Sequence, residues 1–440
     1  TTTTLTGLTA TQALGLTSSQ VGSLSTTQAA SLSTDQLNKL TTAAVAGLNA
    51  TLTASLTTTQ VGGLATTVLS ALSTASVAAL DETQIATLNT SQIQSLKTAQ
   101  LNALTATTLG GLTTTELDGL TTTQVAGLSV AQLANFDTTN IANLETTQLK
   151  GLTAAQLGSF TTDQLGALTT DQLNSLTATA LGALKTTQVT GLTTTQLSGL
   201  DSTHLQALSV AVVHSLDFGQ VDSLTSTQMA QLKTTQLNAL SAAAITDLST
   251  TDVGALTTGQ LSGLNATQVE RLTSTQVGSL TSTQLGAISP AALATFSTDD
   301  IGALSTTQLA GLNTTVFGSL STTVVGALTT TQIGVLTAAE LKSMSTVQLG
   351  AVDETQLSSL TTTALTGLTS TQLSALTTTQ LTLFSTSQIG ALTTSAIAGL
   401  TTDQIPTLST TQIGGITAIQ LAAFSAEQLE ALTDEQQGYL

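Results

Sequence analysis

Only two side chains in this sequence offer the imidazole chemistry that binds transition metals, His204 and His214. They belong to neighbouring segments of the chain, so folding could bring them close together. A zinc site would need further ligands, and no cysteine or acidic cluster stands beside them at a recognisable spacing. We therefore expect both histidines to be polar substitutions in a tolerant background, and we assign no metal ligand.

Carboxylates occur side by side at four places, where they could bind calcium: Asp81–Glu82, Asp299–Asp300, Asp353–Glu354 and Asp434–Glu435. The alternating-ligand loop D-x-[DN]-x-[DN]-G and the GGxGxD repeat, which hold calcium in other proteins, are both absent. An acidic side chain in the first turn of a helix is stabilised by the helix dipole. We expect that structural role for most of these residues.

Serine and threonine are abundant, but no motif that would activate them is present. The sequence has no G-x-S-x-G elbow, P-loop, HExxH or GxGxxG. We therefore expect a protein that is not an enzyme and that has no catalytic or cofactor-binding residues. Four asparagines begin N-x-[ST] sequons, namely Asn49, Asn89, Asn265 and Asn313.

An internal repeat explains these sequons. The segment TTDQLGALTTDQLNSL, residues 161–176, is one octapeptide written twice, and the same phase continues without insertion or deletion to Leu440. The chain is fifty-five octapeptides. A continuous short repeat predicts one elongated solenoid over residues 1–440 rather than several globular domains. All four sequons fall at the first position of a repeat, where asparagine caps helices well, so we expect them without any glycan.

The composition excludes several classes of partner. The formal net charge is −18, with seven Lys and Arg, so there is no basic patch to neutralise nucleic acid or anionic lipid. No apolar run reaches the eighteen or so residues of a membrane span, because Thr or Ser interrupts every repeat. There is no cysteine, so regular packing must replace disulfides in an exported protein.

Two positions of the octapeptide predict the core. With Leu168 at position 8, that position is apolar in all fifty-five copies, and position 5 is Leu, Val, Ile, Met or Phe in fifty-one. These positions are three residues apart, which places them on one side of a helix but on opposite faces of a strand. We expect position 8 to be buried throughout and position 2, such as Thr170, to be mostly exposed.

Two polar positions of the octapeptide predict where each helix begins. Position 1 is Thr, Ser, Asp or Asn in fifty copies, and position 4 is Gln in thirty-five copies and Glu at Glu116 and Glu340. This is a capping box, in which the Thr169 hydroxyl accepts the Gln172 N–H and the Gln172 side chain returns to Thr169. Position 8 of the preceding repeat and position 5 then form a hydrophobic staple.

The helices must be short. Pro290 stands at the first helical position, where proline is tolerated, but Pro406 and many glycines lie at positions 6 and 7. Helices of about a turn and a half are stable only when stacked. The sequence therefore predicts an all-α solenoid of octapeptides, with two to four repeats per coil. A β-solenoid is the alternative, because Thr and Val favour strands and Gln can form ladders.

The octapeptides resemble a known kind of array. TTTQVAGL at 121–128, TTDQLGAL at 161–168 and TTTQLSGL at 193–200 are similar to the LTTxQ[LIV]xxL repeats of large secreted, adhesin-like surface proteins of proteobacteria. The likeness covers the whole chain. It implies an extracellular, cell-surface location, and it provides no catalytic or binding residues to carry over.

We expect from these features a structural protein that assembles with itself. The repeat keeps its phase from TTTTLTGL to TDEQQGYL without a polar capping segment, which predicts head-to-tail filaments or sheets with Leu8 near one junction and Tyr439 or Leu440 near the other. The alternative is an adhesin or lattice-binding module that uses its Thr-rich face to bind ice or a surface polysaccharide.

Overall fold

The computed structural model describes residues 5–440 and is built from helices alone. Every α-helix in this range has four to six residues, and the described residues contain no strand. The α-solenoid is therefore confirmed and the β-solenoid is wrong. The chain divides into two compact units, Thr1–Leu224 and Thr225–Leu440.

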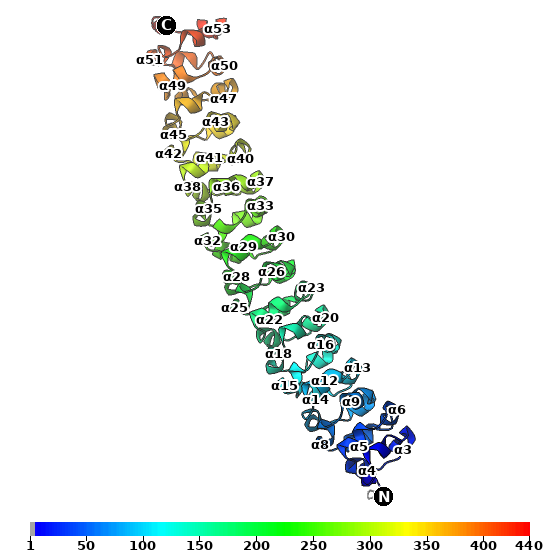
Figure 1. Ribbon diagram of the computed structural model, residues 1–440. Coiled ribbons are helices and arrows are strands. Elements are labelled where there is room, and N and C mark those ends of the chain that lie inside the picture. The colour runs from blue at the N-terminus through cyan, green and yellow to red at the C-terminus, as the bar shows by residue number, and fades with distance from the viewer. Residues whose placement is uncertain (1–4) are drawn as a thin grey trace. The chain divides into compact units, whose positions relative to one another are not determined.

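The helices of the first unit follow one another at octapeptide intervals (Figure 1). They are α2 (Ala10–Ala13), α3 (Ser18–Gly22), α4 (Thr26–Ser31), α5 (Thr34–Asn38), α6 (Thr42–Val45), α7 (Ala50–Ala54), α8 (Thr58–Gly62), α9 (Thr66–Ala71), α10 (Thr74–Ala78), α11 (Glu82–Ile85), α12 (Thr90–Ser95), α13 (Thr98–Leu101), α14 (Ala106–Gly110), α15 (Thr114–Asp118), α16 (Thr122–Gly127), α17 (Val130–Leu133), α18 (Thr138–Ala142), α19 (Thr146–Leu149), α20 (Ala154–Leu157), α21 (Thr162–Gly166), α22 (Thr170–Ser175), α23 (Ala178–Gly182), α24 (Thr186–Val189), α25 (Thr194–Ser198), α26 (Ser202–Ala207), α27 (Val210–His214) and α28 (Phe218–Asp222).

The second unit repeats the same arrangement, with one 3₁₀ helix, η1, among the α-helices. Its helices are α29 (Ser226–Gln231), α30 (Thr234–Leu237), α31 (Ala242–Asp247), α32 (Thr250–Ala255), α33 (Thr258–Ser262), α34 (Ala266–Glu270), α35 (Ser274–Ser279), α36 (Ser282–Ala287), α37 (Pro290–Leu293), α38 (Thr298–Gly302), α39 (Thr306–Leu309), α40 (Thr314–Ser319), α41 (Thr322–Gly326), α42 (Thr330–Ile333), α43 (Ala338–Ser343), α44 (Thr346–Gly350), α45 (Glu354–Ser358), α46 (Thr362–Leu365), α47 (Ser370–Ala375), α48 (Thr378–Thr382), α49 (Thr386–Ala391), α50 (Thr394–Ile397), η1 (Ile405–Thr407), α51 (Thr410–Ile413), α52 (Ala418–Leu421), α53 (Ala426–Glu430) and α54 (Asp434–Gln437).

Each α-helix from α2 to α54 begins at position 2 of its repeat, where the capping box predicts. Thr169 has an extended backbone, its Oγ1 accepts the Gln172 N–H at 3.2 Å, and its own N–H donates to Gln172 Oε1 at 2.7 Å. The helix ends when Leu176 at position 8 returns to an extended conformation. Pro290 stands in the first turn of α37, and Pro406 lies in the 3₁₀ helix, as the missing proline N–H requires.

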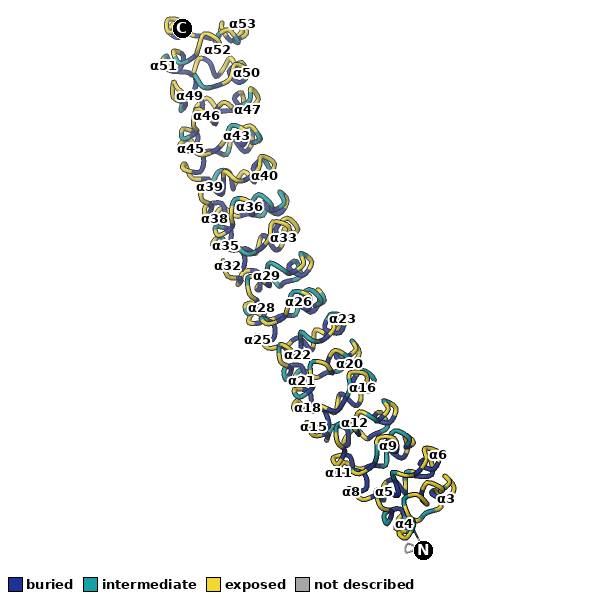
Figure 2. The backbone as a smooth tube through the Cα atoms, viewed as in Figure 1, coloured by how far each residue is buried: buried dark blue, intermediate teal, exposed yellow. Residues whose placement is uncertain are grey.

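Three octapeptides make about one coil, because each helix packs on the third helix after it. In the first unit α7 contacts α10, and α10 contacts α13; in the second unit α29 contacts α32, and α32 contacts α35. Each unit therefore holds three columns of stacked helices, with the position-5 and position-8 side chains buried between them. Buried and exposed residues alternate along the backbone of each unit (Figure 2). Position 8 is buried in every repeat from Leu32 to Leu432.

The outer surface is formed by positions 1, 2 and 3. Position 3 is exposed in every repeat that the structure describes at that position. Position 2 is exposed in most repeats, as expected, but Thr170 is half-buried. The reason is a close approach between coils: a Cβ added to Gly199 would lie 2.3 Å from Thr170 Cγ2.

Candidate functional site

The position-4 glutamines connect each coil to the one before it. Gln172 is buried, and its Nε2 donates to the carbonyl oxygens of Ala142 at 2.9 Å and Leu144 at 2.7 Å. Gln196 likewise donates to the carbonyls of Leu165 at 2.9 Å and Leu168 at 2.5 Å. We call this arrangement the glutamine ladder: a position-4 amide bonded to the position-8 carbonyl 28 residues earlier and to a second carbonyl 30 or 31 residues earlier.

The ladder satisfies backbone groups that short helices leave without partners. The last carbonyls of a helix have no intrahelical donor, and a four-to-six-residue helix consists largely of its two ends. A ladder amide such as Gln172 accepts the N–H of the N-cap residue of its own helix and donates to carbonyls at the helix ends of the preceding coil. A buried polar group left unpaired costs about 1–3 kcal/mol, so the ladder contributes to the binding of adjacent coils alongside the apolar core.

The ladder was not predicted from the sequence, although the composition of position 4 contains its signal. A capping box accepts Glu and Gln equally well, yet position 4 has Gln in thirty-five copies and Glu in only two. Only an amide can accept one hydrogen bond and also donate two. The excess of Gln over Glu therefore indicates a second partner beyond the cap.

Glu116 shows what happens when the donor is missing. Its Oε2 accepts the backbone N–H of Thr113 at 2.7 Å and the Thr113 hydroxyl at 2.8 Å, so the capping role is kept. Its Oε1 is buried and has no hydrogen-bond partner. In the register of the ladder this oxygen takes the place of the Nε2 group, and a carboxylate oxygen cannot donate as the amide does.

A substitution separates the capping role of Gln172 from its ladder role. If capping were its whole role, Gln172→Glu would be neutral. We expect it instead to lower the free energy of unfolding by about 2 kcal/mol, because two buried carbonyls lose their donor and face a carboxylate. Urea denaturation followed by circular dichroism measures this change. The matched control is Gln20→Glu, since Gln20 is exposed and only caps its own helix.

The reverse change at Glu116 tests the same interpretation from the opposite side. Glu116→Gln should raise stability, because the new amide can donate where Oε1 now has no partner. Equal stability of the Gln172→Glu variant and the unmodified chain would show that the ladder contributes nothing.

Asparagines at position 6 form a second connection between coils. The side-chain Nδ2 of Asn38 donates to the Gly63 carbonyl at 2.8 Å, and its Oδ1 accepts the Ala65 N–H at 2.6 Å. The same pair of bonds, 25 and 27 residues ahead, is made by Asn102, Asn174 and Asn238. The acceptor carbonyl always belongs to a position-7 glycine.

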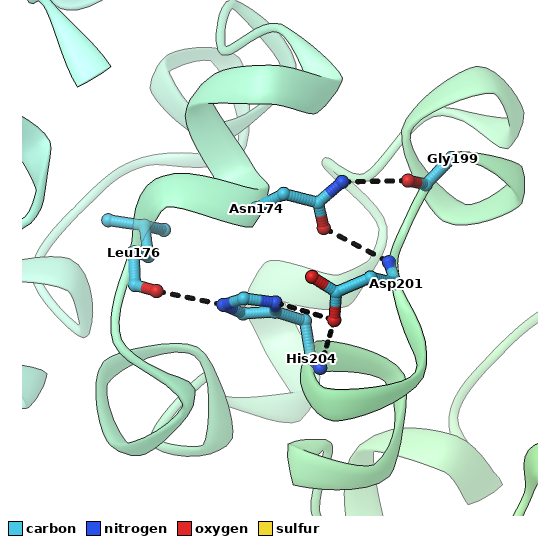
Figure 3. A network of polar contacts seen from close by, with 5 residues as sticks. All are labelled: Asn174, Leu176, Gly199, Asp201 and His204. Carbon is cyan, nitrogen blue, oxygen red and sulfur yellow. Dashed lines mark hydrogen bonds and ion pairs between the residues drawn. The ribbon is translucent and has the colours of Figure 1, made fainter.

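His204 takes the place of a ladder glutamine (Figure 3). Its Nδ1 lies 2.8 Å from Asp201 Oδ1, and its Nε2 lies 2.8 Å from the Leu176 carbonyl oxygen, 28 residues earlier. Asn174 Oδ1 accepts the Asp201 N–H at 3.1 Å, in place of the usual glutamine oxygen. Burial raises the pKa of Asp201, but hydrogen bonds from the His204 backbone and ring outweigh it, and the pKa is lowered overall.

The other candidate residues are His214 and the four sequon asparagines. His214 is exposed at the end of α27, whereas His204 is buried in α26. No group of three His, Cys, Asp or Glu side chains that could hold a metal occurs among the described residues. The sequon asparagines cap helices: the Oδ1 atoms of Asn49, Asn89, Asn265 and Asn313 each accept the N–H three residues ahead.

The acidic pairs lie at helix starts, as expected. Asp81 and Asp353 are N-caps of α11 and α45. The pKa of Asp81 is lowered because the Thr83 hydroxyl and then the Gln84 N–H donate to its carboxylate, and the pKa of Asp353 is lowered mainly by the Gln356 N–H. Asp299–Asp300 and Asp434–Glu435 lie in the first turns of α38 and α54.

The fold and the ladder define a repeat array of short capped helices stacked as a solenoid. Three segments of the chain, residues 141–178, 247–282 and 280–314, match the family model described as the ALTTAQ repeat. These segments lie in both units and support a repeat array of that type. No curated protein matches the chain. Among the residues that the structure describes, no helix is long and apolar enough to cross a membrane.

Proposed function

We propose that this chain is a non-enzymatic structural protein of the cell exterior, which assembles with itself into filaments, fibres or layers. The observation that carries the proposal is that, within each unit, successive coils are connected by position-4 glutamines in the same register. A coil that binds one further coil through the ladder leaves a surface that can bind the next in the same way, so the ladder can lengthen the array. Most of the polar side chains buried in each unit are position-4 glutamines, which make this connection.

Extracellular location is supported by two features of the sequence. The arrays that the octapeptides resemble belong to secreted surface proteins. In addition, the chain has no cysteine and few charged residues, so its stability depends on regular packing and hydrogen bonding, which do not change with the redox state outside the cell.

Self-assembly gives a direct test. A purified polypeptide of these 440 residues should form filaments or sheets as its concentration rises, detected by light scattering and by negative-stain electron microscopy. Protein that stays monomeric at high concentration, with no fibres on the grids, would contradict the proposed function.

A lattice-binding function is the second candidate, and one observation favours it. Position 3, which is often Thr or Ser, is exposed in every repeat where the structure describes it, so each column presents hydroxyl groups at the spacing of the coils. Cosedimentation with insoluble polysaccharides and partition into growing ice test this function. Binding by monomeric protein would favour it over assembly.

A further inference from the structure

Both ring nitrogens of His204 face oxygen atoms that accept hydrogen bonds (Figure 3). Nδ1 lies 2.8 Å from the carboxylate oxygen Oδ1 of Asp201, and Nε2 lies 2.8 Å from the backbone carbonyl oxygen of Leu176. Neither a backbone carbonyl nor an ionised carboxylate can donate a hydrogen bond. Both bonds can therefore exist together only when each nitrogen of the buried ring carries a proton.

A neutral imidazole carries one ring proton and completes only one of these two bonds. With the proton on Nε2, the Leu176 carbonyl keeps its donor, but Nδ1 presents a lone pair to the Asp201 carboxylate. With the proton on Nδ1, the bond to Asp201 remains and the connection to the preceding coil is lost. A ladder glutamine differs from histidine here, because its amide donates without gaining or losing a proton.

We propose that His204 connects α26 to the preceding coil in a proton-dependent manner, with the imidazolium making both bonds and the neutral ring only one. The connection is complete in mildly acidic solution and weaker in alkaline solution, whereas the glutamine ladder donates equally in both. This inference does not depend on the filament function proposed above, since all the groups concerned lie within the first unit.

The stability that this bridge contributes depends on pH through proton binding. Above the ordinary histidine range, about pH 6.5, the unfolded chain has a neutral imidazole, whereas the complete bridge requires one more proton. The contribution is therefore full below that range and is lost as the pH rises. Burial raises the pKa of Asp201, but hydrogen bonds from the His204 backbone and ring, together with the His204 charge, lower it overall. The carboxylate therefore stays ionised in mildly acidic solution.

Asp201 is the charged group that faces the His204 ring. The helix on which α26 packs, α23, belongs to residues 177–184, which contain no titratable side chain. Residues 193–200 and 225–232 contain none either. Asp171 and Lys185, in the octapeptides beside α23, are exposed, as is His214 at the end of α27. The bridge therefore responds to the proton of His204 itself.

Hydrogen exchange of the full chain at a series of pH values tests the proposal. After correction for the pH dependence of chemical exchange, the equilibrium constant for opening of α26 should rise about tenfold from about pH 5.5 to about pH 8.5. The reference is α20, which is attached through Gln156 to the carbonyls of Val125 and Leu128. Its opening constant should change by less than about twofold over this range.

Two substitutions should remove the pH dependence by different routes. His204→Gln supplies an amide donor, as Gln220 does behind the N-cap Asp217. Asp201→Asn keeps a capping oxygen, as Asn89 provides for α12, and its amide can either accept from the ring or donate to it, so it does not favour the charged ring. In both variants the opening constant of α26 should change by less than about twofold across the range.

The matched control is His214→Gln, which removes the other histidine and should keep the full pH dependence of α26. Equal pH dependence in the His204→Gln variant and the unmodified chain would overturn the proposal. Nitrogen-15 NMR of labelled histidine locates the proton independently: the second ring proton of His204 should be lost over the pH interval in which α26 opens more readily. Loss of that proton with no change in α26 exchange would also overturn it. Circular dichroism of each variant confirms that its helices are intact.

Discussion

Replacement of Leu168 by aspartate should lower the free energy of unfolding by about 4 kcal/mol, one of the largest effects of a single substitution in the array. Leu168 is 3% exposed at position 8, and its carbonyl accepts Gln196 of the next coil. The variant would bury a carboxylate at a position that is apolar in every repeat, in a chain that has only seven Lys and Arg. Urea denaturation followed by circular dichroism measures the loss.

The matched control is Thr195→Asp, which puts the same charge at position 3. Thr195 is exposed in the first turn of α25, where the helix dipole favours an acidic side chain. The free energy of unfolding should change by less than about 0.5 kcal/mol. Thr170 is a poorer control because Gly199 of the next coil packs against it. Similar losses for Leu168→Asp and Thr195→Asp would mean that position 8 is not the core.

The sequence predicts those features of the fold that depend on residues close together in the chain. The cap of Thr169 and Gln172, the burial of Leu168 and the placement of Pro290 at a helix start all follow from spacings within one or two octapeptides. The cap is completed by hydrogen bonds within one repeat, and the buried side of the helix follows from the three-residue spacing of the apolar positions. This explains why the type, length and phase of the helices were predictable.

The connections between coils depend on how many repeats complete a turn, which one octapeptide does not encode. Gln172 donates to a carbonyl 28 residues away, and Asn174 to one 25 residues ahead. These separations can be interpreted only once it is known that each helix stacks on the third helix after it. For the same reason the sequence indicates only a polar substitution at His204, and the structure adds that this side chain bridges Asp201 and Leu176 in place of a ladder amide.

Some glycines of the array are required for space rather than for backbone conformation. No described residue, glycine included, has a positive φ, so none of the described glycines is needed for a left-handed turn. A Cβ added to Gly367 at position 7 would lie 1.8 Å from the carbonyl oxygen and 2.5 Å from the carbonyl carbon of Ala338. These are backbone atoms of the preceding coil, and they cannot rotate away.

Gly367→Ala should therefore force two coils apart and lower the free energy of unfolding by about 3 kcal/mol. The separation would also stretch the ladder bonds of the next helix, from Gln372 Nε2 to the carbonyls of Leu341 and Met344, now 2.8 and 2.7 Å long. Hydrogen exchange should show faster opening of α43 and α46, the two helices that pack together across this contact.

Gly350→Ala, in the same unit, should change the free energy of unfolding in the opposite direction. An added Cβ at Gly350 meets nothing within 4 Å, and the residue lies in α44. Alanine is the better helix former, so the free energy of unfolding of this variant should rise by about 0.5 kcal/mol. Thermal or urea denaturation measures this change. A loss at Gly367 with a gain at Gly350 would establish that contact between coils selects glycine at position 7. Losses of equal size would instead assign the effect to the helix backbone, and the close approach of coils would not be what holds the solenoid together.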